Sequence, residues 1–110
     1  MAYDAELAER VRALVARERG LSEKRMFGGL AFLINGHMAV SASGQGGLLL
    51  HVDPADTDAL VREPKVHRAV MRGREMDGWL RVPANAVEDD DDLARWVGRG
   101  VAHARSLAPK

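Results

Sequence analysis

The stretch from Arg25 to Gly36 constrains the fold more than any other part of the chain. A half-buried antiparallel strand alternates apolar and polar residues with a period of two. In a strand over residues 26–34, however, both alternating sets are apolar or glycine: Met26, Gly28, Leu30, Phe32 and Ile34 form one, and Phe27, Gly29, Ala31 and Leu33 form the other. This strand needs cover on both faces. We expect helices on one face, and either loops of this chain, a partner protein or a second copy of the chain on the other.

Asn35-Gly36 follows this run and predicts a hairpin. The pair fits a two-residue type I′ turn, in which both central residues need a positive φ. A second strand is then expected over residues 37–43, a loop over 44–47 and a third strand over 48–52. Three strands joined so closely indicate an antiparallel meander.

The rest of the chain supplies helices and a second hairpin. Residues 3–19 read as a helix with Asp4 as its N-cap and one buried stripe, namely Leu7, Val11, Leu14 and Val15. Asp53-Pro54 predicts the start of a short helix that runs to residue 62 or 63. Residues 66–72 and 75–82 read as paired strands with Gly73 near the turn.

The final helix has the clearest pattern. We expect it over residues 90–107, with one stripe formed by Leu93, Trp96, Val97, Gly100, Val101 and Ala104. Gly100 lies on that stripe, where it would allow a close approach to the sheet. The order α-β-β-β-α-β-β-α predicts a two-layer α+β domain with a five-stranded antiparallel sheet and helices packed on it.

Composition narrows the function classes. The chain has 110 residues, the length of one domain, and contains no Cys, which excludes disulfides and thiol chemistry. Its 16 basic and 16 acidic residues cancel, so bulk charge does not favour nucleic acid. The N-terminus is charged and has no signal-peptide pattern. We expect a cytoplasmic protein that does not enter the membrane.

No local pattern predicts catalysis, a metal or a cofactor. Asp89–Asp92 precede the last helix, where acidic residues favour the N-terminus, and a calcium loop starting at Asp89 would place Ala94 where Gly is required. Gly44–Gly47 lies between two strands, whereas phosphate loops open onto a helix.

The four histidines, His37, His51, His67 and His103, show no local metal-ligand spacing. Five basic residues lie close together in the sequence, namely Arg62, Lys65, Arg68, Arg72 and Arg74. Acidic residues among them reduce the local positive charge, so direct nucleic-acid binding is not expected.

Together these motifs resemble the TfoX/Sxy N-terminal domain family. Lys24-Arg25-Met26-Phe27-Gly28-Gly29 before an apolar strand, then Asn35-Gly36, is similar to the opening signature of that family. Gly73-Arg74-Glu75-Met76, Trp79, Val82-Pro83 and the acidic approach to the last helix agree with it, so the resemblance covers residues 5–107. It implies a two-layer α+β fold and a regulatory role, without catalytic residues. Family members linked to competence act with a cyclic-AMP-receptor-type activator and carry a C-terminal helical domain. This chain ends at Lys110, so we expect a stand-alone domain.

The expected function is therefore a non-enzymatic, regulatory protein-interaction module. The partner would be a protein such as a transcription regulator, or a second copy forming a homodimer. The candidate interaction surface comprises Arg25, Met26, Phe27, Gly28, Gly29 and Leu33. The alternative is a small-molecule-binding domain or enzyme with an apolar pocket near Met26, Phe27 and Trp79, to which Met71 and Met76 could contribute.

Overall fold

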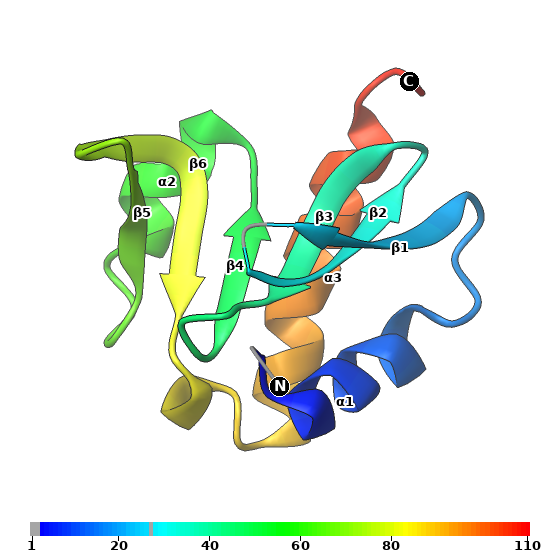
Figure 1. Ribbon diagram of the computed structural model, residues 1–110. Coiled ribbons are helices and arrows are strands. Elements are labelled where there is room, and N and C mark those ends of the chain that lie inside the picture. The colour runs from blue at the N-terminus through cyan, green and yellow to red at the C-terminus, as the bar shows by residue number, and fades with distance from the viewer. Residues whose placement is uncertain (1–2, 27) are drawn as a thin grey trace.

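The fold is a twisted antiparallel sheet with its helices on one face, as a computed structural model that describes residues 3–26 and 28–110 shows (Figure 1). Within those residues the sheet has six strands in the order β1-β2-β3-β4-β6-β5. The strands are β1 (Leu21–Met26), β2 (Gly29–Ile34), β3 (His37–Ala42), β4 (Leu48–His51), β5 (His67–Met71) and β6 (Arg74–Val82). The α-helices are α1 (Ala5–Val15), α2 (Thr57–Leu60) and α3 (Asp90–Ser106). The α+β class and the antiparallel pairing are confirmed.

Both predicted hairpins form. In the β2–β3 turn, Asn35 has φ 53° and Gly36 has φ 86°, as a type I′ turn requires. The β5–β6 turn has the same character, with Arg72 at φ 54° and Gly73 at φ 77°. Strand β6 then pairs with β4, which joins the second hairpin to the meander in one sheet.

The prediction of five strands was wrong. Residues 21–24, expected to be a connection, belong to β1, which pairs with β2 along its whole length. The single strand predicted over residues 26–34 is also divided, because Met26 ends β1 and Gly29 begins β2. Four of the six β1 residues are exposed, so the strand lacks the alternating apolar pattern by which strands are recognised. A polar strand is stable here because it occupies the sheet edge and satisfies the free backbone groups of β2.

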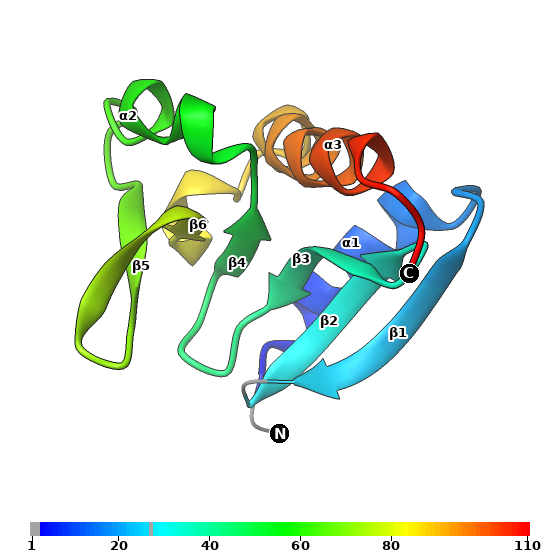
Figure 2. The same cartoon turned by 90° about the horizontal axis from the view of Figure 1, so that it is seen from above.

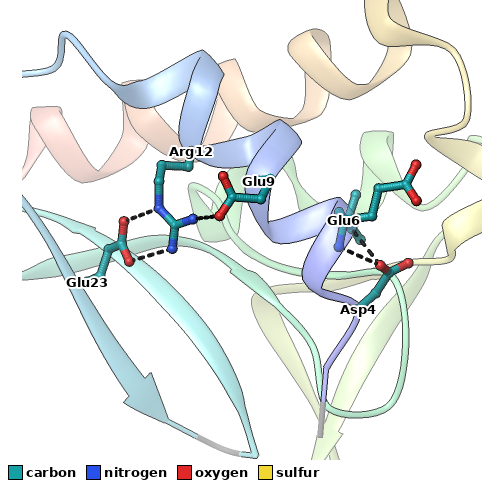
Figure 3. Close-up of polar contacts among 6 residues, drawn as sticks. Asp4, Glu6, Glu9, Arg12 and Glu23 are labelled. Carbon is teal, nitrogen blue, oxygen red and sulfur yellow. Dashed lines mark hydrogen bonds and ion pairs between the residues drawn. The ribbon is translucent and has the colours of Figure 1, made fainter. Parts of the chain in front are cut away.

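A side-chain contact also holds β1 to the first helix. Arg12 on α1 binds Glu23 on β1 with two bonds, Nε to Oε2 at 2.7 Å and Nη2 to Oε1 at 2.9 Å, and also contacts Glu9 (Figure 3). Such a two-bond arginine–carboxylate pair fixes geometry as well as charge. The bond from Arg12 lowers the pKa of Glu23. Asp4 caps the same helix by accepting from the backbone N–H groups of Glu6 and Leu7, as predicted.

The main core lies between the sheet and the helices. In Figure 2, α2 and α3 lie along the same side of the sheet, and residues of all three α-helices contribute to one buried cluster. The stripe of α3 is buried as predicted, except that Val101 is only partly buried. Gly100 allows the close approach, because a Cβ there would lie 2.3 Å from the Ala39 carbonyl oxygen. Leu14, predicted to be buried, is 44% exposed, and the buried residues of α1 are Leu7, Ala8, Val11 and Val15. The helix ends at Val15, so it was also predicted too long.

The second helix is also shorter than predicted. Asp53 accepts a hydrogen bond from the Ala55 N–H, which confirms its capping role, but the first turn is a 3₁₀ turn over Pro54–Asp56. Only one α-helical turn, α2, follows. The chain then reaches Pro64, which prevents the helix from continuing.

Candidate functional site

The sheet face opposite the helices carries a second apolar cluster. Its buried members are Ala31, Met38, Leu49 and Ala69, and its partly exposed members are Met26, Leu33, Met71 and Trp79. We call these eight residues the second face. In the described part of the chain no helix contributes to it. The strand β2 is nevertheless buried on both sides by this chain itself, with Leu33 as the one partly exposed side chain.

Twist and irregular pairing explain how a face without helices becomes buried. In Figure 1, β1 and β2 cross the view while β4 and β6 run up and down it, so the sheet twists strongly between its edges. Pairing shifts between Phe32 and Leu33 and again between Arg68 and Ala69, as at β-bulges, which increase local twist. We infer that the outer strands thereby shield the small residues at the centre of the second face.

The candidate interaction surface is only partly exposed. Arg25 and Gly28 are exposed, and Met26 and Leu33 are partly buried. Gly29 is buried and does not belong to a surface, because a Cβ there would lie 2.3 Å from the Ala42 carbonyl oxygen. Phe27 lies outside the described residues. Met26 and Trp79, proposed for the alternative pocket, do belong to one apolar cluster.

An aromatic cluster that the sequence did not predict lies at the end of β4. The His51 ring stacks on Trp79 with centroids 4.1 Å apart and meets His103 of α3 edge-on at 4.8 Å. His51 Nδ1 lies 3.2 Å from the Met38 carbonyl oxygen. Burial, followed by the nearby His103, lowers the pKa of His51. The three rings come from β4, β6 and α3, so no local spacing could have indicated them.

A cleft lies beside the β5–β6 hairpin, with a volume of about 640 Å³. We call it the cationic cleft, and it is lined by Gln45, Leu49, Val70, Met71, Arg72, Arg74, Met76 and Arg81. It contains three arginines and no acidic residue. Leu49 and Met71 also belong to the second face, so the cleft continues that surface.

Arg81 separates this cleft from a smaller hollow. The hollow has a volume of about 340 Å³ and shares Gln45 and Arg81 with the cationic cleft. It adds Lys65 and His67 to the lining and again no acidic residue. Arg81 is partly buried, and that burial lowers its pKa. Its Nη1 donates to Ser43 Oγ at 2.6 Å, and within the described residues no carboxylate pairs with it.

The other basic residues do not form one patch. Arg68 is bound to Asp58 and Asp77, with Nε 2.9 Å from Asp77 Oδ1. Arg72 and Arg74 instead line the cationic cleft, and Lys65 lines the smaller hollow. Of these basic side chains, Arg68 is therefore neutralised in ion pairs, while Arg72, Arg74 and Lys65 line the two hollows.

The four acidic residues Asp89–Asp92 lie at the N-terminus of α3, with Asp89 as its N-cap and the other three in its first turn. Asp89 caps α3 by accepting from the Asp91 N–H at 2.8 Å, and Asp90 pairs with Arg10 of α1 at 2.8 Å. Among residues 3–26 and 28–110, no three His, Asp or Glu side chains gather in a way that could hold a metal ion. Over the same residues, no helix has the length and apolar character that a membrane crossing needs.

Comparison with protein families identifies the family of this chain. The family described as TfoX N-terminal domain matches residues 13–104, which is most of the chain. The chain belongs to the TfoX N-terminal domain family. No curated protein and no solved structure matches it. In this TfoX N-terminal domain, the Gly28-Gly29 pair of the signature lies at the β1–β2 turn, where Gly28 has φ 76° and Gly29 packs against β3.

Proposed function

We propose that this TfoX N-terminal domain is a non-enzymatic regulatory module that binds another protein through its second face. The protein partner is a transcription activator of the cyclic-AMP-receptor type, by analogy with the competence regulators that the signature resembles. The cytoplasm, where such activators act, is the proposed location. No cofactor or catalytic residue is needed for this role.

The observation that supports the proposal is the pattern of exposure on the second face. Met26, Leu33, Met71 and Trp79 are partly exposed around a buried apolar centre, and no helix residue of the described chain belongs to this cluster. Aromatic residues and methionine are enriched in protein interfaces. Trp79 belongs to this apolar cluster and stacks on His51, and tryptophan is among the residue types most common at binding hot spots.

Substitution of Leu33 tests the proposal. Leu33→Asp places a charge at a partly exposed position of the face, where binding of a protein would bury that charge without an oppositely charged partner. We expect binding to the activator from the same organism, measured by isothermal titration calorimetry, to weaken at least tenfold. Leu14→Asp is the matched control, because Leu14 is an exposed leucine on the helix side of the molecule. It should bind like the unchanged chain.

Circular dichroism and thermal melting establish that Leu33→Asp is folded before binding is compared. A Trp79→Ala variant tests the same face without adding a charge, and it should also weaken binding to the activator. Binding that is equal in all variants, or absent in the unchanged chain, would contradict the proposal. Self-association through the same face is the alternative arrangement. Sedimentation velocity would show it as a dimer that Leu33→Asp converts to a monomer.

A further inference from the structure

We propose that the cationic cleft binds a small amphipathic organic anion. Its carboxylate or phosphate head would contact Arg81, and its apolar chain would lie against Leu49, Met71 and Met76. The cleft shares Leu49 and Met71 with the second face. This inference does not depend on the protein partner proposed above, because ligand binding to the cleft can be measured on the chain alone.

Charge of one sign is concentrated at the cleft of a chain whose formal charge is zero. Arg72, Arg74 and Arg81 line the cleft itself, and Lys65 and His67 line the adjoining hollow. Acids elsewhere neutralise Arg10, Arg12 and Arg68 through ion pairs. A hollow lined by charge of one sign concentrates ions of the opposite sign. The expected ligand is therefore an anion.

Arg81 is the residue suited to hold the head group. A guanidinium has five N–H donors in a planar fork that matches a carboxylate or phosphate. One of these donors reaches Ser43 Oγ, and no carboxylate of the described residues forms an ion pair with Arg81. A partly buried cation without an acidic partner is costly unless something compensates its charge. An anionic head in the cleft would do so, with Gln45 as a further hydrogen-bonding group.

The remaining lining suits an apolar chain rather than a free inorganic ion. Leu49 forms part of the floor and is 2% exposed, while Met76 is 37% exposed. Methionine adapts its shape to different apolar ligands. A volume of about 640 Å³ falls within the range of small-molecule pockets. Each methylene that is fully buried should strengthen binding by about fourfold.

Decanoate and decanol form the decisive pair of probes, because they share a chain and differ in head-group charge. Titration of the full isotope-labelled chain, followed by amide NMR shifts, should show saturable binding of decanoate at residues of the cleft. Decanol should bind at least tenfold more weakly. Inorganic phosphate should bind weakly as well, and higher salt should weaken decanoate binding by screening the charge.

Two variants locate the head group. Arg81→Gln should weaken decanoate binding at least tenfold and leave decanol binding unchanged. Arg17→Gln removes the same charge from an exposed site beyond α1 and should change neither. If Arg81→Gln fails to fold, the decanoate–decanol comparison on the unchanged chain still decides the question. Equal affinity for both probes, equal affinity for phosphate and decanoate, or no shifts at the cleft would overturn the proposal.

A membrane lipid would present the same chemistry as a free anion, and vesicles distinguish the two sources. The cleft has the volume of a small-molecule site, so we expect the free molecule to be the ligand. Phosphatidylcholine vesicles with added phosphatidylglycerol should therefore not sediment with the protein. Co-sedimentation that Arg81→Gln abolishes, without saturable decanoate binding, would overturn the assignment to a free ligand.

Discussion

At the scale of single residues, His51 links the pH of the solution to the stability of the fold. Its ring is stacked on Trp79, lies against His103 and is partly buried, so the folded state disfavours its charged form. Burial and His103 lower its pKa below the ordinary 6.5. Below that value the unfolded chain takes up a proton at His51 that the folded chain does not, so acid favours unfolding.

We expect the free energy of unfolding to decrease as the pH falls through about 6.5, until the folded-state His51 also becomes protonated. His51→Gln should flatten this part of the curve. Urea denaturation at a series of pH values measures it. His67→Gln, at an exposed position on β5, is the control and should retain the slope. A slope equally steep in His51→Gln would show that other groups cause the pH dependence.

At the scale of secondary-structure elements, α3 contains two glycines with opposite roles. A Cβ added at Gly100 would lie 2.3 Å from the Ala39 carbonyl oxygen on β3. Gly98 is exposed on the same helix, and a Cβ there would meet nothing within 4 Å. The sequence indicated a packing reason for Gly100, whereas the structure shows no packing reason for Gly98.

These glycines give a matched pair of substitutions. Gly98→Ala should stabilise the protein by up to about 1 kcal/mol, because alanine favours a helix more than glycine does and its Cβ would clash with no other atom. Gly100→Ala should destabilise it by about 1–3 kcal/mol or more, because backbone atoms must move apart. Thermal melting compares the two. Equal effects of the two substitutions would mean that α3 does not approach the sheet closely.

The elements themselves were largely predictable from local signals. Asn35-Gly36 and Gly73 marked the two hairpin turns, Asp4, Asp53 and Asp89 marked helix starts, and the stripe of α3 was regular. β1 was missed because its polar residues carry no periodic signal. Its strand structure depends on pairing with β2 and on the contact between Arg12 and Glu23.

At the scale of the whole molecule, the centre of the sheet is buried on both faces, although helices cover only one. Leu49 and Leu50 are neighbours on β4 and point to opposite faces, yet they are 2% and 0% exposed. Leu50 belongs to the core under the helices, and Leu49 belongs to the second face. Strand twist and side chains of neighbouring strands replace a second helix layer.

The two leucines test whether the second face is a true core. Leu49→Ala and Leu50→Ala should each destabilise the fold by about 2–5 kcal/mol, as buried leucines do. Chemical denaturation of the two variants measures the cost. A decrease of less than about 1 kcal/mol in the free energy of unfolding for Leu49→Ala alone would show that water reaches the second face more than the structure indicates. That result would favour a partner that covers this face.

By itself, the sequence determined the fold class, both hairpins, the helix starts, the family signature and the absence of thiol chemistry. Each rests on the residue types present or on patterns within a few residues, which act through local backbone geometry. Only the tertiary structure decided that β1 joins the sheet, that β2 is covered by its own chain, and that His51 meets Trp79 and His103. The same holds for the position of Arg81 between two hollows without an acidic partner. These features depend on contacts between residues distant in sequence, which strand order and twist create and which no local pattern encodes.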